Sequence, residues 1–308
     1  MNLKQLEYFV QVAELGSFSK AAVVLEIAQP ALSRQVRALE TELHETLLLR
    51  NGRGVSLTEA GQRLFDHSVG ILQQVALALE DLGEKRDAPV GRITIGLPPS
   101  IGRQLTLPLV DGFRRELPQA KLVIVEGLST HIAEWITTGL VDIGLIYNPD
   151  PVPAINVTPV LEEALCLVAP RTAGQTPAGT TVPLRELSAY PLVVPERRHV
   201  IRRVLESQAV LVGLELDIAW EVSSVAAIID LVCAGYGHAV LTASAVAASG
   251  RAAELSVRPL VDPGLISVLC LATAAHKRPS PLMRHAATML QALARETPQV
   301  VENPSAAP

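Results

Sequence analysis

Aromatic side chains are scarce in this sequence of 308 residues, at 3% of the total. Proteins that bind single-stranded nucleic acid stack its bases on aromatic rings, so the composition argues against a protein of that class. An excess of positive charge is also missing, because the formal net charge is −5 and indicates no general affinity for nucleic acid. Only 19% of residues are charged and 49% are hydrophobic, which is typical of a packed globular protein.

Segments that would insert into membranes are absent as well. No uninterrupted apolar run reaches the length of about 18 residues that a membrane-spanning helix needs. The N-terminal stretch "MNLKQLEYFVQ" lacks a basic segment followed by an apolar run, so we expect no signal peptide. The expected location is therefore cytoplasmic, without membrane association.

Cysteine is rare and carries no recognisable motif. Cys166, Cys233 and Cys270 lie far apart, each inside an apolar run, and no CxxC pair or Cys/His cluster is found. We expect buried, reduced thiols and no metal site, with a redox sensor built on Cys166 and Cys233 as the minor alternative.

Motifs of enzymes are missing too. The sequence has no P-loop, no GxSxG and no HExxH, and "GYGHAV" stops short of a GxGxxG. The seven histidines are scattered, none beside a convincing nucleophile. We predict no catalytic residues and no cofactor, although an enzyme built on the C-terminal part is a competing hypothesis.

The first part of the chain, residues 1–58, reads as short helices. Apolar residues recur at helical spacing up to Gly16, which is typical of a helix stop, and Ser17 is a good N-cap for the next helix. After a third helix, "LLLRNGRGVSLT" contains Asn51-Gly52 and Gly54 and predicts a strand–turn–strand ribbon.

A single long helix is expected over residues 59–86, with Thr58 as its N-cap. Its seam has alternating spacings of four and three residues, which is typical of a helix that pairs with another. We predict dimerisation along this helix. The seam residues assigned to this role are Leu64, Ile71, Val75 and Leu82. Pro89 and Gly91 in "RDAPVGR" then break the helix, so residues 87–91 form the predicted hinge.

Beyond the hinge, residues 92–300 alternate short β-rich runs with helical stretches. The runs are "RITIGL", "KLVIVEG", "DIGLIYN", "YPLVVPE", "LDIAWEV", "GHAVLT" and "ISVLCLAT". This alternation predicts parallel α/β sheets, and the length suffices for two lobes. Residues 301–308 are expected to be a flexible tail.

The stretch "AQPALSRQVRALE", residues 28–40, segregates its charge. At about 100° per residue, Leu32, Val36 and Leu39 share one face of a helix. The other face carries two arginines, a serine and a glutamine without a carboxylate, and these are the side chains that pair with bases and phosphates in the DNA major groove. The alternative is an amphipathic helix with a solvated polar face.

Net charge does not decide between these two interpretations, because residues 1–58 hold six Lys/Arg and six Glu and sum to zero. Only the segregation of charge favours DNA.

The run of residues 6–61, "LEYFVQVAELGSFSKAAVVLEIAQPALSRQVRALETELHETLLLRNGRGVSLTEAG", resembles the N-terminal domain of LysR-type transcriptional regulators. The matching motifs "GSFSKAA", "AQPALSRQ", "LLLR" and "LTEAG" stand at family spacing without a gap. The pair "IAQPALS" and "RGVSLTEAG" looks closest to the nitrogen-assimilation branch. The resemblance implies an N-terminal winged helix-turn-helix, a linker helix and a C-terminal two-lobed α/β effector domain that resembles periplasmic binding proteins.

By this resemblance, the protein is expected to bind dyad-symmetric, double-stranded promoter DNA as a homo-oligomer, a dimer that assembles to a tetramer, and to act on RNA polymerase. Bases would be read by Gln29, Pro30, Ser33 and Arg34 in the recognition helix. Arg53 matches the position in the wing that approaches the minor groove. Phosphates would be contacted by Arg37 and Arg50.

The effector domain would have lobe I at residues 92–162 and 267–300 and lobe II at residues 163–266, with a ligand cleft between them. Ligands of such domains lie beyond the carboxyl ends of strands, beside helix N-termini. Three loops fall there, "PPSIGRQ", "EGLSTHI" and "PERRHVIRR". The candidate effector-binding residues are Ser100, Gly102, Ser129, Thr130, Arg198, His199, Arg202 and Thr242.

Ser100 and Thr130 match family cleft positions, whereas the others follow from their place in the sequence. Each hydroxyl has an alternative role as an ordinary N-cap, and each arginine has one as part of a solvated helix face. If the arginine-rich loop binds ligand, it favours a small anion such as a carboxylate. A binding protein without DNA function is a further alternative, against which residues 1–58 argue.

Overall fold

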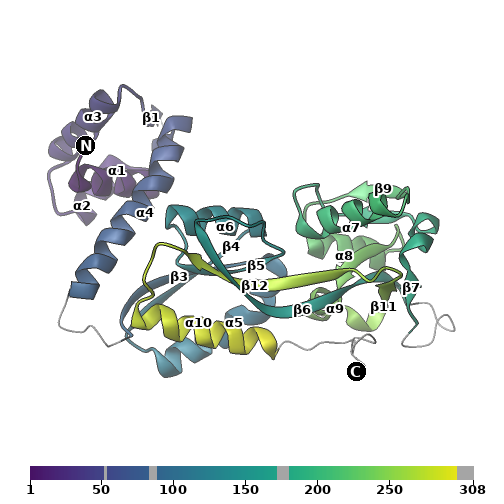
Figure 1. Cartoon of the computed structure of the whole chain (residues 1–308). Coiled ribbons are helices and arrows are strands. Elements are labelled where there is room, and N and C mark those ends of the chain that lie inside the picture. Colours follow the sequence, from purple (N-terminus) through teal and green to yellow (C-terminus); the bar gives the residue numbers. More distant parts are fainter. Residues whose placement is uncertain (52–53, 83–88, 172–179, 297–308) are drawn as a thin grey trace. The chain divides into compact units, whose positions relative to one another are not determined.

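The computed structural model describes residues 1–51, 54–82, 89–171 and 180–296 (Figure 1). The chain divides into two compact units. Residues 1–88 belong to the first unit, and most of residues 89–308 belong to the second. Each unit has its own hydrophobic core, and the second has one core in each of its two lobes.

The first unit contains three helices, a two-stranded ribbon and a long helix. These are α1 (Leu3–Leu15), α2 (Phe18–Val24), α3 (Gln29–Leu43), β1 (Leu48–Asn51), β2 (Gly54–Leu57) and α4 (Glu59–Leu82). Gly16 ends α1 in the left-handed conformation at φ 58°, and the Ser17 hydroxyl accepts a hydrogen bond from the backbone N–H of Lys20. Strands β1 and β2 pair antiparallel, which confirms the predicted ribbon.

The core of this unit forms where the first three helices meet. Phe9 of α1, Ala21 of α2 and Leu32 of α3 are completely buried. The small side chain of Ala21 lets α2 approach its neighbours closely, which is the packing a helix-turn-helix requires. Val36 and Leu39 complete the buried stripe of α3, as its periodicity predicted.

Helix α4 is the long helix that the sequence predicted, as far as the structure describes it. The Thr58 hydroxyl accepts a hydrogen bond of 2.9 Å from the backbone N–H of Gly61 and so caps its first turn. Its 24 residues span about 36 Å at 1.5 Å per residue. Residues 83–86 of the predicted helix and the predicted tail lie outside the described residues.

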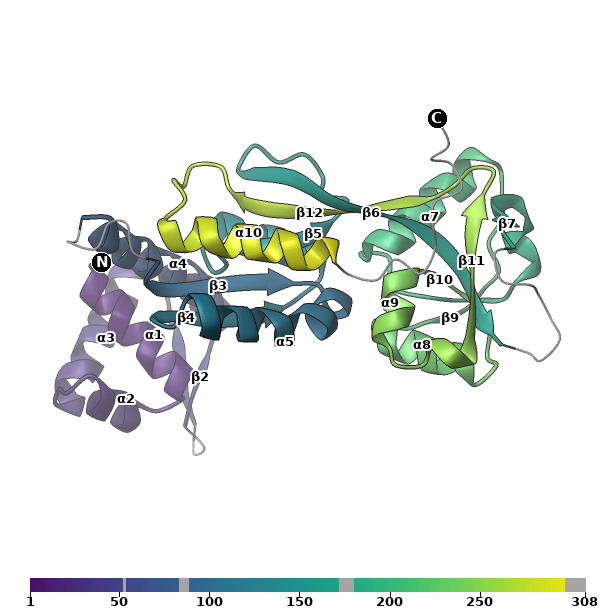
Figure 2. The ribbon, with the colours of Figure 1, turned by 90° about the horizontal axis from the view of Figure 1, so that it is seen from below.

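Lobe I of the second unit is a sheet with helices on it. Its strands are β3 (Gly91–Leu97), β4 (Ala120–Glu126), β5 (Ile143–Tyr147) and β12 (Ile266–Ala274), and its helices are α5 (Pro99–Glu116), α6 (Ser129–Thr138) and α10 (Pro281–Arg295). The strand order is β4-β3-β5-β12, with β3 parallel to both neighbours. Figure 2 shows α5 and α10 side by side, and their apolar faces share one core with the sheet.

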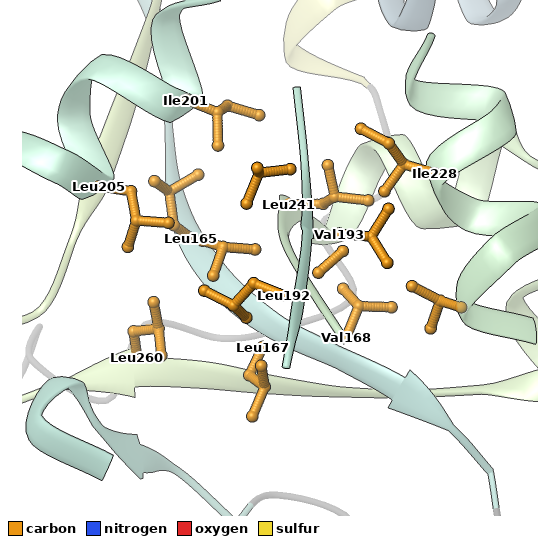
Figure 3. Close-up of a cluster of buried hydrophobic side chains, with 14 of the residues drawn as sticks. Leu165, Leu167, Val168, Leu192, Val193, Ile201, Leu205, Ile228, Leu241 and Leu260 are labelled. Atoms are coloured by element: carbon orange, nitrogen blue, oxygen red, sulfur yellow. The ribbon is translucent and has the colours of Figure 1, made fainter. Parts of the chain in front are cut away.

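Lobe II is built around β10 (Ala239–Thr242), which pairs with β6 (Ile155–Pro170). Its other elements are β7 (Val182–Pro183), β8 (Leu192–Val194), β9 (Ile218–Glu221), β11 (Leu255–Val261), α7 (Val200–Leu211), α8 (Val225–Cys233), α9 (Ala243–Ala248) and the 3₁₀ turns Leu184–Ala189 and Ala252–Glu254. Aliphatic side chains from β6, β8, β10 and the flanking helices α7 and α8 fill its core (Figure 3).

Two strands run through both lobes. Strands β6 and β12 pair antiparallel from Ile155↔Ala274 in lobe I to Ala164↔Ile266 at the start of lobe II (Figure 2). The expectation of parallel sheets holds for β3, β4, β5 and for the pairs β8–β9 and β7–β11, whereas β6, β10 and β12, and β11 on its other edge, make antiparallel pairs. Strands β6 and β11 and helix α10 were not predicted. In β6, Pro159, Glu162 and Glu163 interrupt the apolar pattern that reveals a strand.

Candidate DNA-binding and effector sites

The polar face of α3 is directed to solvent. Gln29, Pro30, Arg34 and Arg37 are exposed, and Ser33 is half-buried. On the opposite side Leu32 and Leu39 are completely buried, so the helix is fixed in the core by one face and offers the other. The four residues that the sequence assigned to base reading thus lie along the N-terminal half of one helix.

The start of α3 is open to an anionic partner. Ala28 caps the helix without a side-chain hydrogen bond, and the first turn contains no acidic residue. The backbone N–H groups and the positive end of the helix dipole therefore face outward uncompensated by a carboxylate. This arrangement suits phosphate contact as well as base contact.

Glu40, the acidic residue at the end of this exposed face, has a structural role that could not be predicted from the sequence. Glu40 Oε1 accepts hydrogen bonds from the backbone N–H groups of Leu47 and Leu48, at 2.9 and 3.2 Å. These donors lie at the start of β1, so Glu40 joins the recognition helix to the ribbon. No local motif could have shown this, because the contact depends on the turn between α3 and β1.

The ribbon is also joined to the turn between α1 and α2. The backbone N–H of Val55 donates to the carbonyl of Gly16, at 2.9 Å. Arg53, the predicted wing residue, lies outside the described residues. Arg50 lies in β1, but the position of its side chain is not described.

The predicted dimer seam on α4 divides into two parts. Leu64 packs against the core of the first unit, together with Phe65 and Leu72. Ile71 is 39% exposed, and Leu79, which lies between the seam residues Val75 and Leu82, is 68% exposed. Val75 is half-buried, and the side chain of Leu82 is not described. The exposed apolar surface of α4 therefore lies in its second half.

A cavity of about 570 Å³ opens between the two lobes of the second unit. Four helices begin at residues that line it, namely α5 at Pro99, α6 at Ser129, α7 at Val200 and α8 at Val225. Their dipoles place four partial positive charges around one space. The side chains of Arg103 and Arg198 add two full charges, against one lining carboxylate, Glu126.

Five of the eight predicted effector-binding residues line this cavity. These are Ser100, Ser129, Arg198, His199 and Thr242. They come from both lobes, as expected for a cleft. "PPSIGRQ" was predicted to be a loop, and this was wrong, since α5 already begins at Pro99. Ser100 consequently lies in the first turn of a helix.

Gly102, Thr130 and Arg202 do not line the cavity. Gly102 is buried, and a side chain there would collide with the Glu126 carboxylate, so its role is to let that residue approach. Thr130 is exposed. Arg202 is only 2% exposed, donates to Glu206 at 2.6 Å and to the Pro195 carbonyl at 3.3 Å, and therefore holds α7 in place.

Three lining residues also accept backbone hydrogen bonds, and for Thr242, the N-cap of α9, this is the role that the N-cap alternative gave it. His199 Nδ1 accepts from the Ile201 N–H at 3.3 Å, and the Thr242 hydroxyl accepts from the Ala245 N–H at 3.3 Å. The Ser129 hydroxyl accepts from the Tyr147 N–H at 3.0 Å. Burial lowers the pKa of His199 to about 4, so its imidazole is neutral near pH 7.

Tyr147 is a lining residue that the sequence analysis missed. Its hydroxyl donates to Glu163 Oε2 at 2.9 Å. Burial, followed by the negative charge of Glu163, holds the pKa of Tyr147 well above its ordinary value. The ring therefore presents a neutral wall to the cavity. Ser224, also missed, caps α8 by accepting from the Ala227 N–H at 3.4 Å, a role that its place before "VAAIIDLV" could have indicated.

Helix α5 of lobe I is hydrogen-bonded to lobe II beside the cavity. Arg103 donates to the carbonyl of Ser249 at 3.2 Å, and Gln104 donates to the carbonyl of Ser244 at 3.1 Å. A second connection is the ion pair of Arg203 with Asp150 at 2.9 Å. A ligand that changes the separation of the lobes would act on these contacts.

The cysteines show no reactive environment. Cys166 is buried, and burial together with the charge of Glu163 raises its thiol pKa to about 12. Burial raises the pKa values of Cys233 and Cys270 as well. A thiol of raised pKa is a poor nucleophile, which disfavours the redox-sensor alternative.

Across the described ranges no group of His, Cys, Asp or Glu is arranged to hold a metal ion. No helix in the described part of the chain combines the length and apolarity needed to cross a bilayer.

A helix-turn-helix unit with an open recognition face, followed by a two-lobed domain with a cavity between its lobes, defines a ligand-responsive DNA-binding regulator. Two family models match the chain. "Bacterial regulatory helix-turn-helix protein, lysR family" matches residues 3–62, and "LysR substrate binding domain" matches residues 86–295.

Characterised relatives agree. The nitrogen assimilation regulatory protein nac of Klebsiella aerogenes is 35% identical over 265 residues, which cover 83% of this chain and 85% of the relative. The regulator BbuR of Bordetella bronchiseptica is 30% identical over 94% of this chain and 88% of its own length. A solved full-length OxyR variant from Pseudomonas aeruginosa has a TM-score of 0.72 at 26% identity and covers 99% of both chains.

The protein belongs to the LysR family of transcriptional regulators. It is a DNA-binding transcriptional regulator with an effector-binding domain.

Proposed function

We propose that this regulator reads its operator with the N-terminal half of α3. Arg34 and Gln29 contact base edges, Pro30 and Ser33 pack against the same bases, and Arg37 contacts phosphate. The observation that carries this assignment is the exposed face of α3, which has two arginines and no carboxylate until Glu40. Arg50 and Arg53 of the ribbon complete the set, as phosphate and minor-groove contacts.

The operator in this proposal is dyad-symmetric, because two copies of the chain pair along α4. Ile71 and Leu79 supply an exposed apolar surface for that pairing. Exposed apolar side chains on α5, Leu107 and Val110, and on α7, Val210 and Leu211, supply a second surface, through which dimers assemble into tetramers. The assembly acts on RNA polymerase at promoters in the cytoplasm and catalyses no reaction.

The effector in this proposal is a small anion, with a carboxylate as the leading candidate. Support comes from the four helix N-termini and two arginines around the 570 Å³ cavity. Ser100, Ser129 and Thr242 supply hydroxyl groups. His199 forms part of the cavity wall as a neutral imidazole that caps the N-terminus of α7. Arg202 acts indirectly, by holding the helix that carries this end of the cavity.

A gel-shift titration on DNA upstream of the regulated operon tests the recognition helix. Arg34→Ala should weaken binding by about 1–3 kcal/mol per half-site, or about 5- to 150-fold, the discrimination a bidentate arginine supplies. Arg115→Ala is the matched control, because Arg115 is an exposed arginine of the effector domain paired with Glu116. Equal affinity of the two variants for the operator would remove α3 from its assigned role.

A further inference from the structure

Lobe II contains a second cavity, of about 450 Å³, that shares no lining residue with the cavity between the lobes. It lies where β6 ends at Pro170, where β10 is about to begin at His238, and beside Arg258 of β11. Tyr190, Tyr236 and Ser256 also line it.

Two buried nitrogen atoms of side chains at this cavity have no hydrogen-bonding partner among the described residues. They are Arg258 Nε and His238 Nδ1. A guanidinium N–H and an imidazole nitrogen that are buried without a partner cost free energy, so such groups in folded proteins are usually explained by a ligand, ion or water. Here both belong to side chains that line the same space.

The charge around the cavity is one-sided. Arg258 lies over the ring of Tyr190, with 5.6 Å from its guanidinium carbon to the ring centroid, and it makes no ion pair with a described residue. None of the lining residues that the structure describes is acidic. The His238 ring packs edge-on against Tyr190 at 4.9 Å, and burial and then Arg258 lower its pKa while the Pro191 carbonyl opposes the shift. The cavity therefore holds one uncompensated cation beside a neutral imidazole.

The rim is aromatic. Tyr236 is exposed and packs edge-on against exposed Trp220, with ring centroids 6.4 Å apart. Tyr190 is already held inside the cavity by Arg258. A ligand that reached the arginine with its charged end would therefore place its body between tyrosine rings, which favours a planar, apolar body.

We propose that this cavity is a second ligand site, which binds a small planar organic carboxylate through Arg258 and His238, with Tyr190 and Tyr236 enclosing its body. The Arg258 side chain lines the cavity and supplies the positive charge, and a guanidinium carries N–H groups in a fork geometry that fits the two oxygens of a carboxylate. The His238 imidazole lines the cavity beside it. Gly237 allows the wall to close, because a side chain there would lie 2.7 Å from the Pro191 carbonyl.

The cavity between the lobes and the second cavity lie at opposite ends of one short strand of lobe II. His238 precedes β10 and lines the second cavity, while Thr242 ends β10 and lines the first. The strand between them, Ala239–Thr242, is buried along its whole length in the lobe II core (Figure 3). The two sites are therefore separate, although residues at the two ends of the same buried strand, β10, line them.

Calorimetric titration of the full-length protein tests the site, with benzoate as probe and benzamide as its neutral counterpart. Benzoate should bind and benzamide should not, because the neutral amide does not pair with the guanidinium. Arg258→Gln should weaken one benzoate site by about 10- to 100-fold, the range for a lost charged hydrogen-bond pair. Arg258→Lys keeps the positive charge without the forked guanidinium, so its affinity for benzoate should lie between those of the wild-type protein and Arg258→Gln.

Arg198→Gln is the matched control, since it makes the same change in the first cavity. It should leave the Arg258-dependent site intact, and a crystal soaked with 4-iodobenzoate should show the iodine beside Tyr190. Benzoate affinity that is unchanged in both Arg258 variants, or that is lost only in Arg198→Gln, would overturn the proposal. Operator binding by gel shift is measured separately on each variant, so a failure here leaves the DNA-binding proposal untouched.

Discussion

Replacing Glu40 by alanine should loosen the ribbon without disturbing the recognition helix. The carboxylate accepts two backbone hydrogen bonds, from Leu47 and Leu48, and both donor residues are buried. The alanine variant leaves these two N–H groups without their acceptor. Hydrogen bonds to charged groups contribute about 1.5–3 kcal/mol each. Because Glu40 is half-buried, the lower end applies, and we expect a loss of about 2–4 kcal/mol.

Hydrogen–deuterium exchange of the peptide that spans β1 measures this loss directly. A change of about 2–4 kcal/mol in local opening corresponds to about 30- to 900-fold faster exchange of those amides. Glu40→Gln keeps one acceptor oxygen and should lose less. Exchange over α3 itself should hardly change, since Leu32 and Leu39 still anchor that helix.

Glu42→Ala is the matched control, two residues further along the same helix. Glu42 is exposed and pairs with the N-terminal amino group, away from the ribbon amides, so its removal should leave the ribbon unaffected. If the Glu40 and Glu42 variants exchange at the same rate over β1, the connection between recognition helix and ribbon carries no free energy and the reasoning is refuted.

Three further results are expected. Ile71→Glu should dissociate the dimer in sedimentation experiments, because Ile71 is 39% exposed in the single chain, whereas an unchanged mass would exclude α4 as the interface. The pKa of His199 is lowered from 6.5 to about 4 in the folded protein, so as the pH falls the unfolded chain is protonated at this histidine before the folded chain is. The free energy of unfolding should therefore decrease by up to about 3 kcal/mol as the pH is lowered from 6.5 to about 4. Urea unfolding of His199→Asn, which keeps a capping oxygen, should lack that part of the pH dependence. Arg202→Met should lower the free energy of unfolding by about 1–3 kcal/mol without abolishing folding, because the carboxylates of Glu206 and Glu221 remain accessible to water. An unchanged urea unfolding curve would contradict the positioning role of Arg202.

Local signals in the sequence predicted the first unit well. Gly16, Ser17 and Thr58 each act on the backbone within a few residues, so their roles as helix stop and N-caps follow from chemistry that is local. The buried stripe of α3 depends only on helical periodicity. By contrast, the contact of Glu40 with β1 spans seven and eight residues across a turn and could not be read from spacing.

The effector domain was harder to predict because its decisive contacts are distant in sequence. Arg202 and Arg198 look alike in "PERRHVIRR", but only the three-dimensional structure shows that one is paired with Glu206 and the other lines the cavity. Tyr147 carried no signal, since its partner Glu163 lies in a strand that the sequence analysis did not find. The second cavity combines β6, β11 and the turn that precedes β10, which no local pattern would bring together.

The connectivity of β6 and β12 sets the order in which the effector domain can form during synthesis. Lobe II is a continuous segment between these strands, whereas the lobe I sheet has β12 inserted between β5 and β6. When the ribosome has released lobe II, lobe I still lacks β12 and α10, so the core around β3, β5 and α5 lacks the apolar side chains that these two elements contribute. The lobe that begins first is therefore completed last, and its unfinished sheet is the surface that the cell must protect from aggregation while the chain is being made.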